Sequence, residues 1–162
     1  EPFELPQVYR FVDRAKKIAD IFMAAGSLFI VSAPVKEIIK AHDRGRSLLW
    51  PIKVRQPREE VKEPYFGLYI PTHLRAFDEK NTPRTAFSRS QYGGHVQSNY
   101  PDNKNISKFK LLPEVYEGHA LWWDSEISAT EFFISGALYE DLKSASLNIP
   151  RCAKVTAAQV QG

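Results

Sequence analysis

The chain has 162 residues, of which 43% are hydrophobic and 25% are charged. These values are typical of a folded globular protein and favour neither a disordered nor a fibrous chain. The net charge of +3 comes from 22 basic and 19 acidic residues spread along the chain. A dedicated nucleic-acid-binding protein carries a dense basic patch, so we expect no nucleic-acid partner. The length is typical of one domain, so we expect a single domain over residues 1–162.

The hydrophobic segments and the cysteine content indicate a cytoplasmic protein. Apolar runs such as Leu28–Val31 are far shorter than the roughly 18 residues of a membrane span. The segment Glu1–Pro6 lacks the cationic start and apolar core of a secretory signal. Cys152 is the only cysteine, which rules out an internal disulfide and suits a reducing compartment. We therefore expect no membrane partner.

The first 26 residues are predicted to contain a helix. Apolar residues recur there at spacings of three and four, which is typical of an amphipathic helix. They are Val8, Phe11, Val12, Ala15, Ile18, Ala19 and Phe22. Gly26 would end this helix.

Two later parts of the chain repeat one order of elements: an apolar strand ending in serine, a helix, then a proline and a β-prone segment. The first unit is Leu28–Val31, a helix from Ser32 to about His42, and Leu48–Val54; the second is Glu131–Ile134, Gly136–Leu147 and Arg151–Thr156. Ser32 and Ser135 are expected to cap the two helices, each contributing about 1 kcal/mol.

The centre of the chain contains further predicted strands and one long polar segment. The strands are Tyr65–Ile70, Lys108–Leu112 and Ala120–Trp123. Residues 79–106 are rich in Asn, Ser, Arg and Pro and include Gly93-Gly94, which predicts a long loop, either a contact surface or a plain flexible connection. The fold class is therefore α+β, with a mixed or mostly antiparallel sheet flanked by a few helices.

No motif points to a metal, a cofactor or a nucleotide. The sequence contains neither a phosphate-binding glycine loop nor a dinucleotide fingerprint. The histidines are scattered singly, without the spacing of metal ligands. They are His42, His73, His95 and His119.

Candidate catalytic residues each have a simpler structural interpretation. Cys152 could act as a thiolate nucleophile, but it follows Pro150-Arg151 in an apolar tail, where we expect a buried packing residue. The carboxylates of Asp78-Glu79, and of Asp124 with Glu126, could exchange protons, yet such close pairs are frequent in solvated turns. We therefore predict no catalytic residue and no enzymatic activity.

Four residues are candidate contacts with a protein partner. Trp122 and Trp123 would point to opposite faces of a strand, and if one ring is exposed it would be a natural anchor. Both rings lying in the core is the simpler alternative. Arginine and tyrosine are enriched in binding hot spots. The predicted partner-binding residues are Trp123, Tyr92, Arg89 and His95.

The order of segments resembles the Imm11-like family, a group of bacterial immunity proteins of polymorphic toxin systems that was formerly a domain of unknown function. The resemblance rests on Leu28–Val54, on Tyr65–Ile70 continuing to Phe77-Asp78, and on Phe132–Lys154. The sequence departs from the usual pattern of the family at Asn148-Ile149-Pro150, where a glycine-containing turn would be expected. The resemblance implies a cytoplasmic protein that binds a cognate toxin and blocks its active site.

Two alternatives stay open. One is an accessory or chaperone-like adaptor for a secreted effector, and the other is a hydrolase that uses Cys152.

Overall fold

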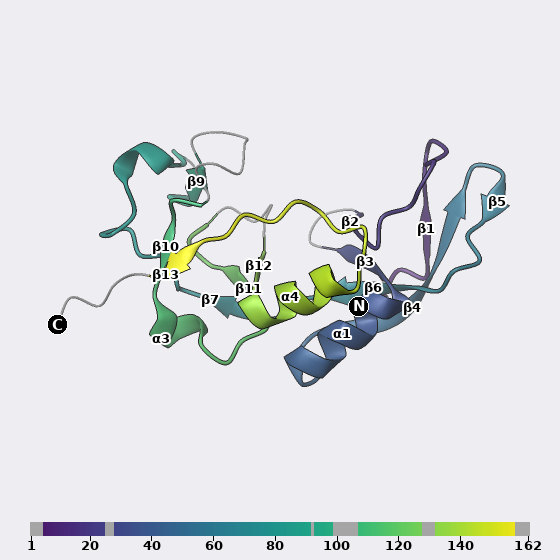
Figure 1. The fold of residues 1–162 in the computed structure, drawn as a ribbon. Coiled ribbons are helices and arrows are strands. Elements are labelled where there is room, and N and C mark those ends of the chain that lie inside the picture. The colour runs from purple at the N-terminus through teal and green to yellow at the C-terminus, as the bar shows by residue number, and fades with distance from the viewer. Residues whose placement is uncertain (1–4, 25–27, 92, 99–106, 128–131, 158–162) are drawn as a thin grey trace. The chain divides into compact units, whose positions relative to one another are not determined.

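The computed structural model describes residues 5–24, 28–91, 93–98, 107–127 and 132–157 (Figure 1). The chain divides into two compact units: unit 1 comprises residues 1–71 and 135–150, and unit 2 comprises residues 72–134 and 151–162. Both units contain strands and helical segments, which confirms the predicted α+β class. Each unit is described by itself below.

Unit 1 is built on one mixed, mostly antiparallel sheet with the strand order β1-β4-β6-β3-β2. Only the pairing of β1 with β4 is parallel, and β5 adds an antiparallel pairing to the end of β4. The strands are β1 (Val8–Arg10), β2 (Ile21–Met23), β3 (Phe29–Ser32), β4 (Leu48–Gln56), β5 (Glu59–Glu60) and β6 (Tyr65–Tyr69). The kind of sheet predicted from the sequence is thus confirmed.

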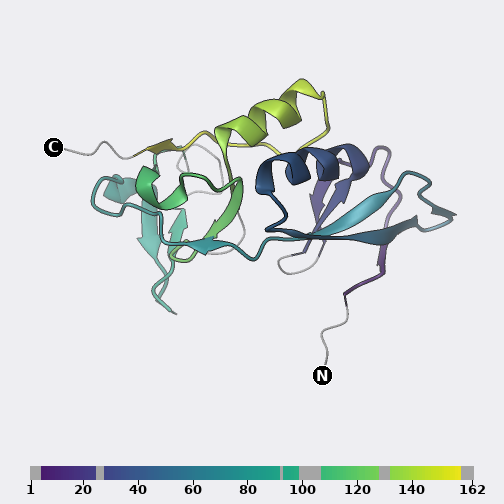
Figure 2. The same ribbon diagram turned by 90° about the horizontal axis from the view of Figure 1, so that it is seen from below.

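Two helices complete unit 1. Helix α1 (Ala33–Asp43) contacts strands β3 and β6, and it also contacts helix α4 (Gly136–Ser144) (Figure 2). The buried residues Val35 and Ile39 of α1, and Leu138 and Leu142 of α4, recur at a spacing of four, so each helix turns one apolar stripe inward. The strand-helix-strand order predicted over Leu28–Val54 is confirmed.

The predicted N-terminal helix is wrong, because the described part of this segment contains strands β1 and β2. Its backbone bonds to β4 instead: the amide of Phe11 donates to the carbonyl of Arg55 at 2.9 Å, and the amide of Lys53 donates to the carbonyl of Gln7 at 2.9 Å. The apolar side chains that suggested a helical stripe pack on the sheet, where aromatic and branched residues also fit well. Those packed on this core cluster include Tyr9, Phe11, Ile18 and Phe22.

Unit 2 consists of short elements. Its strands form the sheets β12-β11-β7, β8-β9 and β10-β13. In chain order the elements are β7 (His73–Leu74), η1 (Arg84–Ala86), β8 (Phe87–Arg89), β9 (Val96–Ser98), β10 (Lys110–Leu111), α3 (Pro113–Tyr116), β11 (Leu121–Asp124), β12 (Phe133–Ile134) and β13 (Thr156–Ala157). The strand expected over Arg151–Thr156 lies later, where β13 runs parallel to β10.

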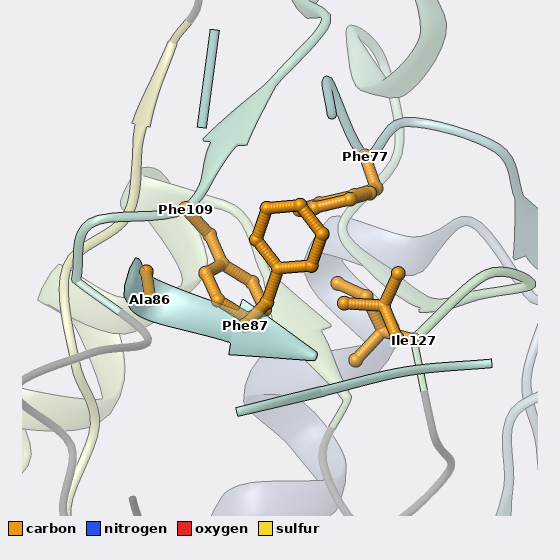
Figure 3. Close-up of a cluster of buried hydrophobic side chains, with 6 residues drawn as sticks. Phe77, Ala86, Phe87, Phe109 and Ile127 are labelled. Carbon is orange, nitrogen blue, oxygen red and sulfur yellow. The ribbon is translucent and has the colours of Figure 1, made fainter. Parts of the chain in front are cut away.

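The segment 79–106 is not one long loop. Its described part contains the turn η1 and the hairpin of β8 and β9, and Phe87 and Val96 of this hairpin are buried. Phe87 lies against Phe77 and Phe109, with 5.3 Å between the ring centres of Phe77 and Phe87 (Figure 3). The polar composition of this segment did not indicate a hairpin, because only a few apolar residues pack its strands into the core.

Two aspartates expected in solvated turns are buried and organise the backbone of unit 2. The Oδ2 atom of Asp124 accepts hydrogen bonds from the amides of Ala76 and Phe77, both at 2.8 Å, and its Oδ1 accepts from the amide of Glu126 at 2.9 Å. Asp78 accepts from the amide of Asn81 at 3.1 Å and from its side-chain nitrogen at 2.6 Å. The interpretation as solvated turns is wrong for these two carboxylates.

None of the helices in the described ranges is both long enough and apolar enough to cross a membrane.

Candidate functional site: an arginine ladder in unit 2

Five charged side chains of unit 2 form a continuous series of ion pairs, which we call the arginine ladder. Its order is Arg84, Glu79, Arg89, Glu126 and Arg75. Arg84 Nη1 lies 2.7 Å from Glu79 Oε1, and Arg89 bridges the two glutamates, with Nη2 3.3 Å from Glu126 Oε2. Arg75 closes the series by donating from Nη2 at 2.6 Å and from Nε at 2.9 Å to Glu126 Oε1.

The two buried aspartates place the glutamates of the ladder. Glu79 directly follows Asp78, and Glu126 stands two residues after Asp124, which accepts its backbone amide. Each aspartate points inward, and the glutamate beside it belongs to the ladder. In each of the two carboxylate pairs considered for acid and base catalysis, the aspartate is therefore structural and the glutamate is ion-paired.

The hydrogen bonds of the ladder favour the charged forms of its three inner members, Glu79, Arg89 and Glu126. The hydrogen bond from Arg89 lowers the pKa of Glu79 below its ordinary value of 4.5, and the hydrogen bond from Arg75 does the same for Glu126. In return, the hydrogen bond to Glu79 raises the pKa of Arg89 above its ordinary value. A hydrogen bond to the charged form of a group favours that form.

Exposure differs strongly along the ladder. The side chains of Arg75 and Arg84, at the two ends, are 78% and 76% exposed. The inner members are more enclosed: Arg89 is 40% exposed, Glu79 29% and Glu126 21%. The surface therefore presents two outlying guanidinium groups, held by carboxylates that lie deeper.

The partner-binding residues predicted from the sequence lie in different surroundings. Trp123 is 3% exposed, and its ring packs edge-on against Phe132 at 5.9 Å. The expectation of an exposed tryptophan anchor is therefore wrong, since Trp122 and Trp123 are both buried and β11 is a core strand on both faces. Tyr92 lies outside the described residues.

Arg89 and His95 do lie together, on the β8–β9 hairpin. Arg89 is the inner arginine of the ladder and also donates from Nη1 to the carbonyl of Gly94 at 2.7 Å. His95 is exposed, and its carbonyl accepts from the amide of Ser90 at 2.8 Å. Arg75 was missed, because its partner Glu126 lies 51 residues away and no local spacing could connect them.

The predictions for Cys152 and for the two serines expected to cap helices have mixed outcomes. The Cys152 side chain is exposed, so the prediction of a buried residue is wrong. Protein atoms around the thiol still disfavour its charged form and raise its pKa. Ser135 caps α4 by accepting from the amide of Leu138 at 3.2 Å, whereas the buried Oγ of Ser32 caps no amide of α1.

Within the described ranges, no three side chains of His, Cys, Asp or Glu gather in a group that could hold a metal ion. Comparison with known protein families and with curated proteins finds no match to this chain.

Proposed function

We propose that this chain binds a cognate bacterial toxin and neutralises it by covering its active site. The observation that carries the proposal is the arginine ladder, a fixed surface with two outlying guanidinium groups. The resemblance of the sequence to the Imm11-like family supports the same function. Such a protein would act in the cytoplasm, where it meets the toxin.

The electrostatics of the ladder suit recognition better than catalysis. A general acid or base works best with a pKa near the operating pH, but the pKa values of Glu79 and Glu126 are lowered from an ordinary value that is already acidic. The pKa of Arg89 is raised by its hydrogen bond to Glu79, which also favours the charged form. Proton transfer is therefore a poor use of this site, whereas a constant pattern of charge is useful for binding.

The ladder also reduces the entropy lost on binding. Long side chains that must be immobilised at an interface each lose about 0.5–1.5 kcal/mol. Here the two exposed arginines are already held, Arg75 by Glu126 and Arg84 by Glu79. Exposed ion pairs add little to stability, typically about 0–1 kcal/mol, so recognition explains this series of pairs better than folding does.

The test is affinity capture of the tagged protein from the cells that produce it, followed by expression of the main partner alone and together with this chain. The proposal expects a stoichiometric protein that arrests growth alone and is harmless when co-expressed. A partner that is harmless alone would instead indicate an adaptor for an effector.

A hydrolase using Cys152 is a second candidate, because the thiol is exposed and a substrate could reach it. The raised pKa argues against it, since the thiolate is the nucleophile. Replacing Cys152 with serine should leave the biological activity unchanged under the first proposal. Loss of that activity in a variant with native circular dichroism would establish the second.

A further inference from the structure

We infer that Arg75 and Arg84 each bind a carboxylate of the partner, and that Arg89 is a positioning residue that holds the ladder together. The partner would therefore carry two separated acidic side chains on its contact surface. This inference rests on the proposed function in one respect, namely that the partner is a protein.

The hydrogen-bond donors of the ladder point to this division of roles. A guanidinium group has five N–H donors. Arg84 gives Nη1 to Glu79 and lies over the ring of Phe87 at 5.4 Å, and Arg75 gives Nε and Nη2 to Glu126. Among the described residues these two arginines have no other partner, so each keeps donors for a second acceptor.

Arg89 uses more of its hydrogen-bond donors within the ladder and its hairpin. Its Nη2 contacts both glutamates, and its Nη1 donates to the carbonyl of Gly94. Because Glu79 and Glu126 each accept from Arg89 and from one outer arginine, Arg89 fixes the distance between the two outer groups. Its effect on binding is therefore indirect.

The order of charges favours a protein over a nucleic acid. Three arginines and two glutamates leave the ladder with one net positive charge. A nucleic acid carries a continuous row of phosphates, and the glutamates between the arginines would repel it. Two separate carboxylates avoid these glutamates and can each form the bidentate pair that arginine favours.

The probes for the test are synthetic peptides with two glutamates separated by serine spacers of increasing length, compared with glutamine versions and with an oligothymidine. Binding to the full chain is measured by fluorescence anisotropy at low salt. We expect one spacing to bind best, and Arg75→Gln and Arg84→Gln each to weaken it about tenfold.

The matched control is Arg14→Gln, because Arg14 in unit 1 is also 78% exposed and also pairs with a glutamate, Glu59. This variant should bind the peptides as the wild type does. The inference is overturned if Arg14→Gln weakens binding equally, if the glutamine peptides or the oligothymidine bind as well as the best glutamate peptide, or if no peptide binds.

The positioning role of Arg89 has its own measurement. In Arg89→Gln the pKa of Glu79, followed by carboxyl NMR, should rise toward the ordinary value, and the preference for one spacing should be lost while weak binding persists. Arg89→Lys should restore part of the pKa shift. A preference that survives Arg89→Gln unchanged would remove Arg89 from the inference.

Experiments with the captured partner separate the inference from the proposed function. If the partner is harmless but needs Arg75 and Arg84 to bind, the proposed function fails and the inference stands. If a toxic partner is bound and neutralised equally well by the Arg75→Gln, Arg84→Gln double variant, the function stands and the inference fails.

Discussion

The two units reach a stable fold by different means. Unit 1 has one continuous sheet, in which the nine-residue strand β4 pairs with the five-residue strand β6 over the whole length of β6. The strands of unit 2 have two to four residues, and buried polar groups such as Asp124 connect them. Unit 1 therefore depends mainly on strand pairing and apolar packing, whereas unit 2 combines apolar clusters, such as that of Phe77, Phe87 and Phe109, with buried side chains that hydrogen-bond its short strands.

This difference bears on the candidate site. In unit 2, the buried side chains that connect the short strands are neighbours of the ladder glutamates. The fold of unit 2 and the geometry of the ladder should therefore respond together to mutation. Unit 1 should tolerate loss of a single polar contact better than loss of a close-packed contact.

The largest expected effect is that of Asp124→Ala, which removes the acceptor of three backbone amides, of which those of Ala76 and Phe77 are left buried without a partner. We expect a loss of about 3 kcal/mol or more in the free energy of unfolding of unit 2. Urea denaturation followed by tryptophan fluorescence, to which Trp122 and Trp123 of unit 2 and Trp50 of unit 1 contribute, measures it.

The control is Asp43→Ala in unit 1, because Asp43 is also buried but accepts one backbone amide, that of Ser47 at 2.6 Å. Its effect should be clearly smaller. Equal effects would contradict the contrast between the units.

The next effect is that of Gly67→Ala in unit 1. A Cβ atom at Gly67 would lie 2.3 Å from the ring of Trp50, and this ring is held by a hydrogen bond from Nε1 to the carbonyl of Pro6 at 2.8 Å. We expect a loss of about 1–3 kcal/mol from overpacking, measured by thermal unfolding.

A double-mutant cycle checks the cause. In a Trp50→Leu background the same Gly67→Ala change should be much less destabilising, because the ring is gone. An unchanged loss would place the strain elsewhere.

A smaller effect is expected at Ser32 and Ser135, which stand at the N-termini of the two helices of unit 1. Ser135→Ala removes the acceptor of the Leu138 amide and should destabilise unit 1 by about 1 kcal/mol. Ser32→Ala removes a buried hydroxyl without a hydrogen-bond partner, so it should be neutral or slightly stabilising. Two equal losses in urea titrations would show that Ser32 also acts as a cap.

The sequence predicted well where one local pattern matched one element. The β3–α1–β4 order followed from Leu28–Val54, and β11 followed from Ala120–Trp123. It failed at residues 7–25, where apolar residues at helical spacing also fit one side of a sheet, and pairing with β4 decided the outcome.

The candidate site could be predicted only in part. Arg89 and the two carboxylate pairs were visible as residue types, and the interpretation of Asp78 and Asp124 failed because burial does not follow from local polarity. The meeting of Arg75 with Glu126 depends on the pairing of β7 with β11. A contact between residues so far apart in the sequence can be predicted only when the order of the strands in the sheet is known, and a single sequence does not give that order.

The smallest expected effect concerns acid. Because the folded pKa values of Glu79 and Glu126 are lowered, their contribution to stability is present above pH 4.5 and is lost as the pH falls through the lowered values. The Glu79→Gln, Glu126→Gln double variant should therefore lose less stability than the wild type between pH 5 and pH 2.

The matched change in unit 1 is Glu37→Gln, since Glu37 also has a lowered pKa, caused mainly by a hydrogen bond from Lys36. One lysine holds Glu37 and two arginines hold each ladder glutamate, so Glu37→Gln should alter the acid profile less; a larger change would contradict the ladder's role in fixing charge on unit 2.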